Sequence, residues 1–146
     1  MIPISFQDNV QRYQQRLDHL YDNIKKWVEK ENFIVTTYSS EIFEESESYL
    51  ASALLIHTHG GKVLAHLKPQ GVSVVLAEGL VEVENWWENE HLIYLPAGGP
   101  HIKDECGVQQ VVYDGVEQAG WYWDRLNTCP HLLNKTVFLE LLNWIS

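Results

Sequence analysis

Between residues 33 and 123, short apolar stretches alternate with tight turns, and no helical pattern separates them. The stretches are rich in β-branched and aromatic residues, a composition typical of strands. Turn signals such as Gly60-Gly61, Pro69-Gln70-Gly71 and Asp114-Gly115 divide them. Connections this short join antiparallel strands, because parallel strands need a crossover of a dozen or more residues. We therefore expect an antiparallel, meandering sheet of about six to seven strands.

The boundaries of the strands follow from the same signals. We predict strands at 33–38, 49–59, 62–68, 72–77, 80–84, 91–95, 108–113 and 118–123. Residues 39–48 are acidic and contain serines, and they are expected to form a link. The last two strands are expected to pair with each other around Asp114-Gly115.

Residues 5–31 carry the pattern of one long helix. Ser5 is the expected N-cap, with Asp8 three positions after it. Such a helix packs its apolar stripe on its own sheet or pairs with a second copy in a homodimer. Apolar residues at alternating steps of four and three form the stripe: Phe6, Val10, Tyr13, Leu17, Leu20, Ile24 and Trp27.

A second helix is predicted at 135–145, with Asn134 as its cap. The 146 residues have the length of one domain, and no internal repeat or linker divides them. The sequence therefore predicts a single α+β domain over 1–146, with a long N-terminal helix, the antiparallel sheet and a C-terminal helix. The apolar face of the second helix would comprise Val137, Phe138, Leu141, Leu142 and Ile145.

Three histidines surround the predicted Gly60-Gly61 turn. If the turn has two residues, His59 faces Lys62, His57 faces Leu64 and Leu55 faces His66. All three histidines, His57, His59 and His66, then lie on the face of the hairpin away from the core.

The histidine face has alternative interpretations. His57 and His59 would lie about 6–7 Å apart, close enough to bind one zinc or other divalent ion, with His66 as a third ligand. A small metal-dependent enzyme, with Glu82 as its base, is the functional alternative. Lys62 and Lys68 share the face and oppose a bound cation, so a polar face without metal is the competing interpretation.

The formal net charge of −10 restricts the partners of the protein. It argues against general nucleic-acid binding, because the phosphate backbone would be repelled. It would steer a basic protein towards this surface. The same net charge would keep the protein soluble even if it had no charged partner.

Tryptophans lie beside acidic residues in two places. Trp86 and Trp87 are flanked by Glu88 and Glu90 in a predicted loop. Trp121 and Trp123 alternate on a predicted strand and share one face. Exposed tryptophans are typical anchors of protein interfaces, although buried tryptophans are as common. A second acidic segment contributes Glu44 and Glu45 to the candidate partner-binding residues.

Targeting and redox signals are absent from the sequence. No apolar run is long enough for a membrane-spanning helix, and the first residues lack the pattern of a signal peptide, so a cytoplasmic protein is expected. Cys106 and Cys129 have no C-x-x-C spacing and are expected to stay reduced.

These features favour a non-catalytic acidic module that binds a more basic protein. An inhibitor, an antitoxin or immunity protein, or an accessory subunit would have this chemistry, and no cofactor is required.

Overall fold

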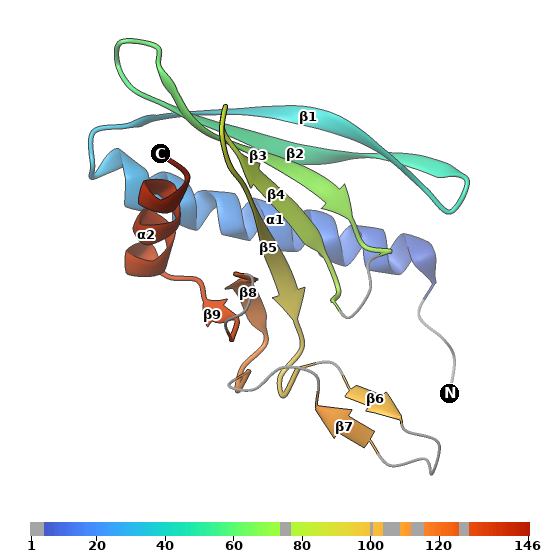
Figure 1. Ribbon diagram of the computed structural model, residues 1–146. Coiled ribbons are helices and arrows are strands. Elements are labelled where there is room, and N and C mark those ends of the chain that lie inside the picture. The colour runs from blue at the N-terminus through green and yellow to red at the C-terminus, as the bar shows by residue number, and fades with distance from the viewer. Residues whose placement is uncertain (1–4, 74–76, 100, 104–108, 112–115, 126–128) are drawn as a thin grey trace.

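The computed structural model describes residues 5–73, 77–99, 101–103, 109–111, 116–125 and 129–146. Within them, seven strands form one antiparallel sheet in the order β1-β2-β3-β4-β5-β8-β9, and β6 and β7 form a separate pair (Figure 1). The predicted α+β fold is confirmed. The elements are α1 (Phe6–Glu29), β1 (Ile34–Glu44), β2 (Glu47–His57), β3 (Val63–Gly71), β4 (Leu80–Glu84), β5 (Asn89–Leu95), β6 (His101–Lys103), β7 (Gln109–Val111), β8 (Gly120–Trp123), β9 (His131–Leu132) and α2 (Lys135–Ile145).

Helix α1 crosses one face of the sheet, and its apolar stripe supplies the core (Figure 1). The buried residues of the stripe include Tyr13, Leu17 and Ile24, each fully shielded from solvent. They pack with the inward residues of the central strands, such as Leu54 and Val83. A homodimer through this stripe would therefore have to give up the core of each chain.

Both helices begin where the sequence predicts. The backbone N–H of Asp8 donates to Ser5 Oγ at 3.1 Å, and that of Val137 donates to Asn134 Oδ1 at 2.9 Å. These bonds satisfy donors that have no partner within the helix.

Among the described residues, neither helix combines the length and the apolar character that crossing a membrane requires.

The predicted link at 39–48 is wrong, because β1 and β2 extend through it as a hairpin. Glu44 pairs with Glu47, and Glu45 and Ser46 form a two-residue turn with φ of 52° and 61°. Positive φ at both positions defines a type I′ turn, which normally carries Asn-Gly. Because Glu-Ser lacks that signature, the turn could not be recognised from local residue types.

Strand β3 continues through Pro69, where the sequence predicts a turn. The pairing with β4 shifts between Pro69 and Gly71, so the strand bulges there. The N–H groups of Gln70 and Gly71 donate to the hydroxyl of Tyr13 on α1, at 3.1 and 3.2 Å. A side chain distant in sequence therefore replaces the missing ladder bonds. Val72 and Ser73 lie outside any strand, and 74–76 of the predicted strand 72–77 lie outside the described residues.

The predicted pairing of the last two strands is also wrong. β8 pairs with β5, and β7 pairs with β6, a strand that the sequence did not indicate. Apolar side chains on both faces of β8 suit its position inside the sheet, between β5 and β9. Trp121 and Trp123 lie in the α1 core, and Tyr122 packs in a second cluster on the opposite face. The expected turn at Asp114-Gly115 lies outside the described residues.

Candidate functional site

The face of the sheet away from α1, which we call the outer face, carries a row of mostly polar residues. One cross-strand row runs from Thr36 through Leu55, His66 and Glu84 to Asn89, one residue from each of β1 to β5. Their neighbours in sequence point into the core, so alternation places this row on the opposite side.

Side chains of the outer face contact one another closely around His66. The Tyr38 hydroxyl forms a hydrogen bond with His66 Nε2, and His66 Nδ1 lies 4.0 Å from a Glu84 oxygen. Lys68 forms an ion pair with the same Glu84 oxygen. One strand further, Asn89 Nδ2 donates to Glu82 Oε1 at 2.6 Å. The outer face is thus an organised polar surface rather than a set of independent solvated groups.

The two carboxylates of β4 differ in acidity. The Lys68 ammonium lowers the pKa of Glu84, whereas burial and the neighbouring Glu84 charge raise the pKa of Glu82. Burial and the Lys68 charge lower the pKa of the His66 imidazole. Opposed shifts in neighbouring groups are common at functional sites, although structural networks produce them too. The charges of His66, Glu82 and Glu84 are therefore set by burial and by neighbouring groups on the same face.

The structure separates the three histidines proposed as metal ligands. His57 Nε2 lies 3.1 Å from Thr36 Oγ1, and His66 bonds with Tyr38. His59 follows the end of β2 and is exposed in the Thr58–Lys62 turn. The described residues contain no group of three His, Cys, Asp or Glu side chains placed to hold a metal ion.

The hairpin register explains this separation. Leu55 faces His66 as predicted, but a shift after Ile56 places His57 opposite Val63 instead of Leu64. The turn is longer than two residues, because the Thr58 N–H donates to the Lys62 carbonyl at 2.9 Å. His59 and Lys62 therefore do not face each other.

Trp86 and Trp87 occupy the tip of the β4–β5 hairpin, which we call the tryptophan turn (Asn85–Glu88). They are 88% and 87% exposed. Asn85 Oδ1 accepts hydrogen bonds from the N–H groups of Trp87 and Glu88, at 2.8 and 3.0 Å. The Asn85 amide also donates to the carbonyl of Ile145, which ties the turn to the end of α2. The two indoles therefore project from a fixed backbone.

A shallow pocket of about 330 Å³ lies where the tryptophan turn meets the outer face. Leu55, Val63 and Trp86 give it apolar walls, and His66, Glu84 and Asn85 supply polar atoms. An apolar hollow with a few convergent polar groups is the usual form of a recognition site. The sequence did not suggest Tyr38, Leu55 or Asn85 for this site, and only the Asx-turn position of Asn85 left a signal.

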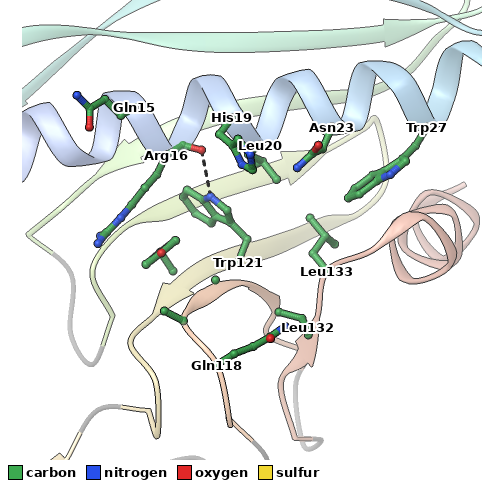
Figure 2. A pocket seen from close by; sticks show the side chains of 13 residues that line it. Gln15, Arg16, His19, Leu20, Asn23, Trp27, Gln118, Trp121, Leu132 and Leu133 are labelled. Carbon is green, nitrogen blue, oxygen red and sulfur yellow. Dashed lines mark hydrogen bonds between the residues drawn. The ribbon is translucent and has the colours of Figure 1, made fainter.

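The prediction of Trp121 and Trp123 as partner anchors is wrong, because they are 7% and 3% exposed. Trp123 Nε1 donates to Glu90 Oε2 at 3.2 Å, so Glu90 supports the core rather than facing a partner freely. Trp121 Nε1 donates to the Arg16 carbonyl at 3.3 Å, drawn as the dashed line in Figure 2. Both indoles find polar partners inside the chain, as buried tryptophans usually do.

Figure 2 shows a second pocket, of about 410 Å³, between α1 and the β8–β9 edge. Trp27, Trp121 and Leu133 form apolar walls, and polar side chains of α1 such as His19 and Asn23 line the same pocket. Its charged group, Arg16, is already held: its guanidinium lies 3.8 Å from the Tyr94 ring centre and 3.1 Å from Glu78. The pocket therefore offers no unengaged charge to orient a ligand.

The acidic residues proposed for partner binding divide into two groups. Glu88 and Glu45 are exposed. Glu44 accepts hydrogen bonds from the N–H groups of Val72 and Ser73 and from the Tyr49 hydroxyl. Its carboxylate therefore holds the chain after β3, and its role in partner binding stays a prediction.

The lowered pKa of His66 predicts a pH-dependent contribution to stability. Because the unfolded chain binds this proton more readily, the contribution is complete above the ordinary pKa of 6.5 and declines as the pH falls towards the folded value. We expect the melting temperature of the wild type to fall more between pH 7 and pH 5 than that of His66→Gln. Calorimetry of both proteins measures this difference, and parallel curves would contradict it.

Comparisons of this chain with family models, curated proteins and solved structures gave no match, so its function is inferred from its own residues.

Proposed function

We propose that this protein is a non-catalytic acidic module that binds a more basic protein. The tryptophan turn carries the proposal. Two neighbouring indoles exposed at 88% and 87% on a hydrogen-bonded backbone are costly to leave in water unless a partner covers them. Tryptophan is the residue most enriched among the anchors of protein interfaces.

The charge of the chain supports a basic partner. The formal net charge is −10, and Glu88 is exposed directly beside the two indoles. Complementary charge around an apolar anchor raises the association rate and fixes the orientation of the partner. The pocket between Trp86 and His66, with apolar walls and a few polar groups, extends the contact surface onto the outer face. An inhibitor, an antitoxin or immunity protein, or an accessory subunit would use such a surface.

The first experiment identifies the partner and tests the charge argument. The immobilised protein captures proteins from a lysate of its source, and the captured partner is purified for stopped-flow kinetics. We expect the association rate to fall at least tenfold between about 50 and 500 mM salt, with a small change in the dissociation rate.

Glu88→Gln provides the matched variant for this experiment, because it removes one exposed charge and keeps the shape of the side chain. It is expected to reduce the salt dependence without lowering the melting temperature. An association rate that does not change with salt would remove the basic partner from the proposal.

A further inference from the structure

The two edges of the main sheet differ greatly. One edge is β9, which has two residues, and the other is β1, which has eleven. A strand of eleven residues is about 36 Å long. In the described part of the chain, β1 pairs with β2 alone, so the backbone groups along its other side have no strand partner.

Strand β1 lacks most of the usual protections of an exposed edge. Its sequence, IVTTYSSEIFE, contains no proline, glycine, lysine or arginine, and its charged residues are the acidic Glu41 and Glu44. Its register with β2 runs without a shift through all eleven pairs, so no bulge twists the edge away. Soluble proteins normally interrupt such an edge because it is a template for another chain.

Several side chains along β1 are also exposed and could contact an added strand. Thr36, Thr37 and Ser39 are exposed, and Phe43 is 74% exposed. β-Branched and aromatic residues of this kind pair well with side chains of a neighbouring strand. The edge therefore offers both backbone and side-chain contacts to an extended segment.

Charge decides which segment fits. The β1–β2 hairpin, residues 34–57, carries Glu41, Glu44, Glu45 and Glu47 and no lysine or arginine. A second copy of β1 would bring the same acidic charge to the edge and would be repelled. An extended segment rich in lysine or arginine would be attracted.

We propose that the β1 edge binds an extended basic segment of the partner as an additional strand of the sheet. This inference rests on the proposed function and specifies how the partner is held. Main-chain hydrogen bonds would supply affinity, and the acidic hairpin would supply selectivity. The start of β1 shares its cross-strand row with Glu84, two residues before Trp86, so one partner can reach the edge and the tryptophan turn.

The test uses three synthetic nine-residue peptides as probes. The first alternates lysine with valine and threonine. The second has the same charge but carries prolines that prevent strand pairing. The third replaces the lysines with glutamates. We expect the first peptide to bind at least tenfold more tightly than the second, and the third not to bind, as measured by fluorescence anisotropy.

Amide hydrogen exchange identifies the mode of binding. With the first peptide bound, alternate amides of β1 are expected to gain protection, since every second residue faces the open edge. Glu41→Lys, at an exposed position, is expected to weaken binding without unfolding the chain. Equal binding of the lysine and proline peptides would overturn strand addition, and so would a dimer of the free protein with β1 already protected.

The result of the peptide test can be distinguished from the result of the test of the proposed function. If the captured partner needs Trp86 and Trp87 but leaves the β1 amides unprotected, the strand inference fails and the proposed function stands. If the lysine peptide adds to β1 but the association rate of the captured partner does not change with salt, the basic partner of the proposed function is excluded while strand addition at β1 stands.

Discussion

Replacing Tyr13 with phenylalanine is expected to lower the free energy of unfolding by about 3 kcal/mol. The Tyr13 hydroxyl is buried, donates to the Leu80 carbonyl at 2.5 Å, and accepts from the N–H groups of Gln70 and Gly71. Phenylalanine keeps the ring but leaves these three backbone groups without partners. Each buried unpaired group costs about 1–3 kcal/mol.

Tyr21 provides the matched control on the same helix. It is 4% exposed, and its hydroxyl is the one buried side-chain polar atom in the described residues without a hydrogen-bond partner. Because Tyr21→Phe removes a polar group that gains nothing from burial, it is expected to leave stability unchanged or to raise it.

Urea denaturation of the wild type and both variants measures the difference. A loss of about 3 kcal/mol corresponds to a melting temperature lower by about 10 °C in a domain of this size. Equal effects of the two substitutions would show that ring packing, and not the hydrogen bonds of Tyr13, controls the stability of the β3–β4 bulge.

The periodic parts of the fold could be predicted from the sequence because their signals are local. The α1 stripe, the Asn134 cap and the alternation of Val81 and Val83 each depend on neighbouring residues. The Glu45-Ser46 turn and the continuation of β3 through Pro69 could not be predicted in this way. The turn has positive φ at two residues that rarely adopt it. The continuation of β3 depends on the hydroxyl of Tyr13, which lies on a helix distant in sequence.

The candidate site likewise has features with a local sequence signal and features that depend on distant neighbours. Exposure of Trp86 and Trp87 follows from a polar turn sequence, which is visible locally. Burial of Trp121 and Trp123 depends on β8 lying beside β5, with α1 above it, and no local pattern specifies that neighbour. The predicted grouping of His57, His59 and His66 depended on a two-residue turn, whereas β2 ends at His57 and the pairing shifts after Ile56, so His59 lies in a longer turn.

Replacing Trp86 and Trp87 together with alanine is expected to weaken partner binding at least a hundredfold. Each tryptophan at an interface centre contributes about 2 kcal/mol or more on truncation, and a hundredfold loss corresponds to about 2.7 kcal/mol. The melting temperature is expected to stay the same, because both side chains are already in solvent and the turn binds Asn85 Oδ1 through the backbone N–H groups of residues 87 and 88. Isothermal titration with the captured partner measures the loss.

Leu50→Ala separates a specific anchor from general surface hydrophobicity. Leu50 is 59% exposed but lies with Gln14 and Asp18 between α1 and the hairpin, on the opposite side of the sheet from the outer face. Its removal is expected to leave affinity within about twofold of the wild type, because Leu50 does not contact the tryptophan turn and β1 lies between it and a strand added at the edge. If Leu50→Ala and the tryptophan variant weakened binding equally, the partner would recognise apolar surface in general. Because Leu50 belongs to the β1–β2 hairpin and the tryptophan turn to the β4–β5 hairpin, a large loss confined to the tryptophan variant would place the partner at the tryptophan turn.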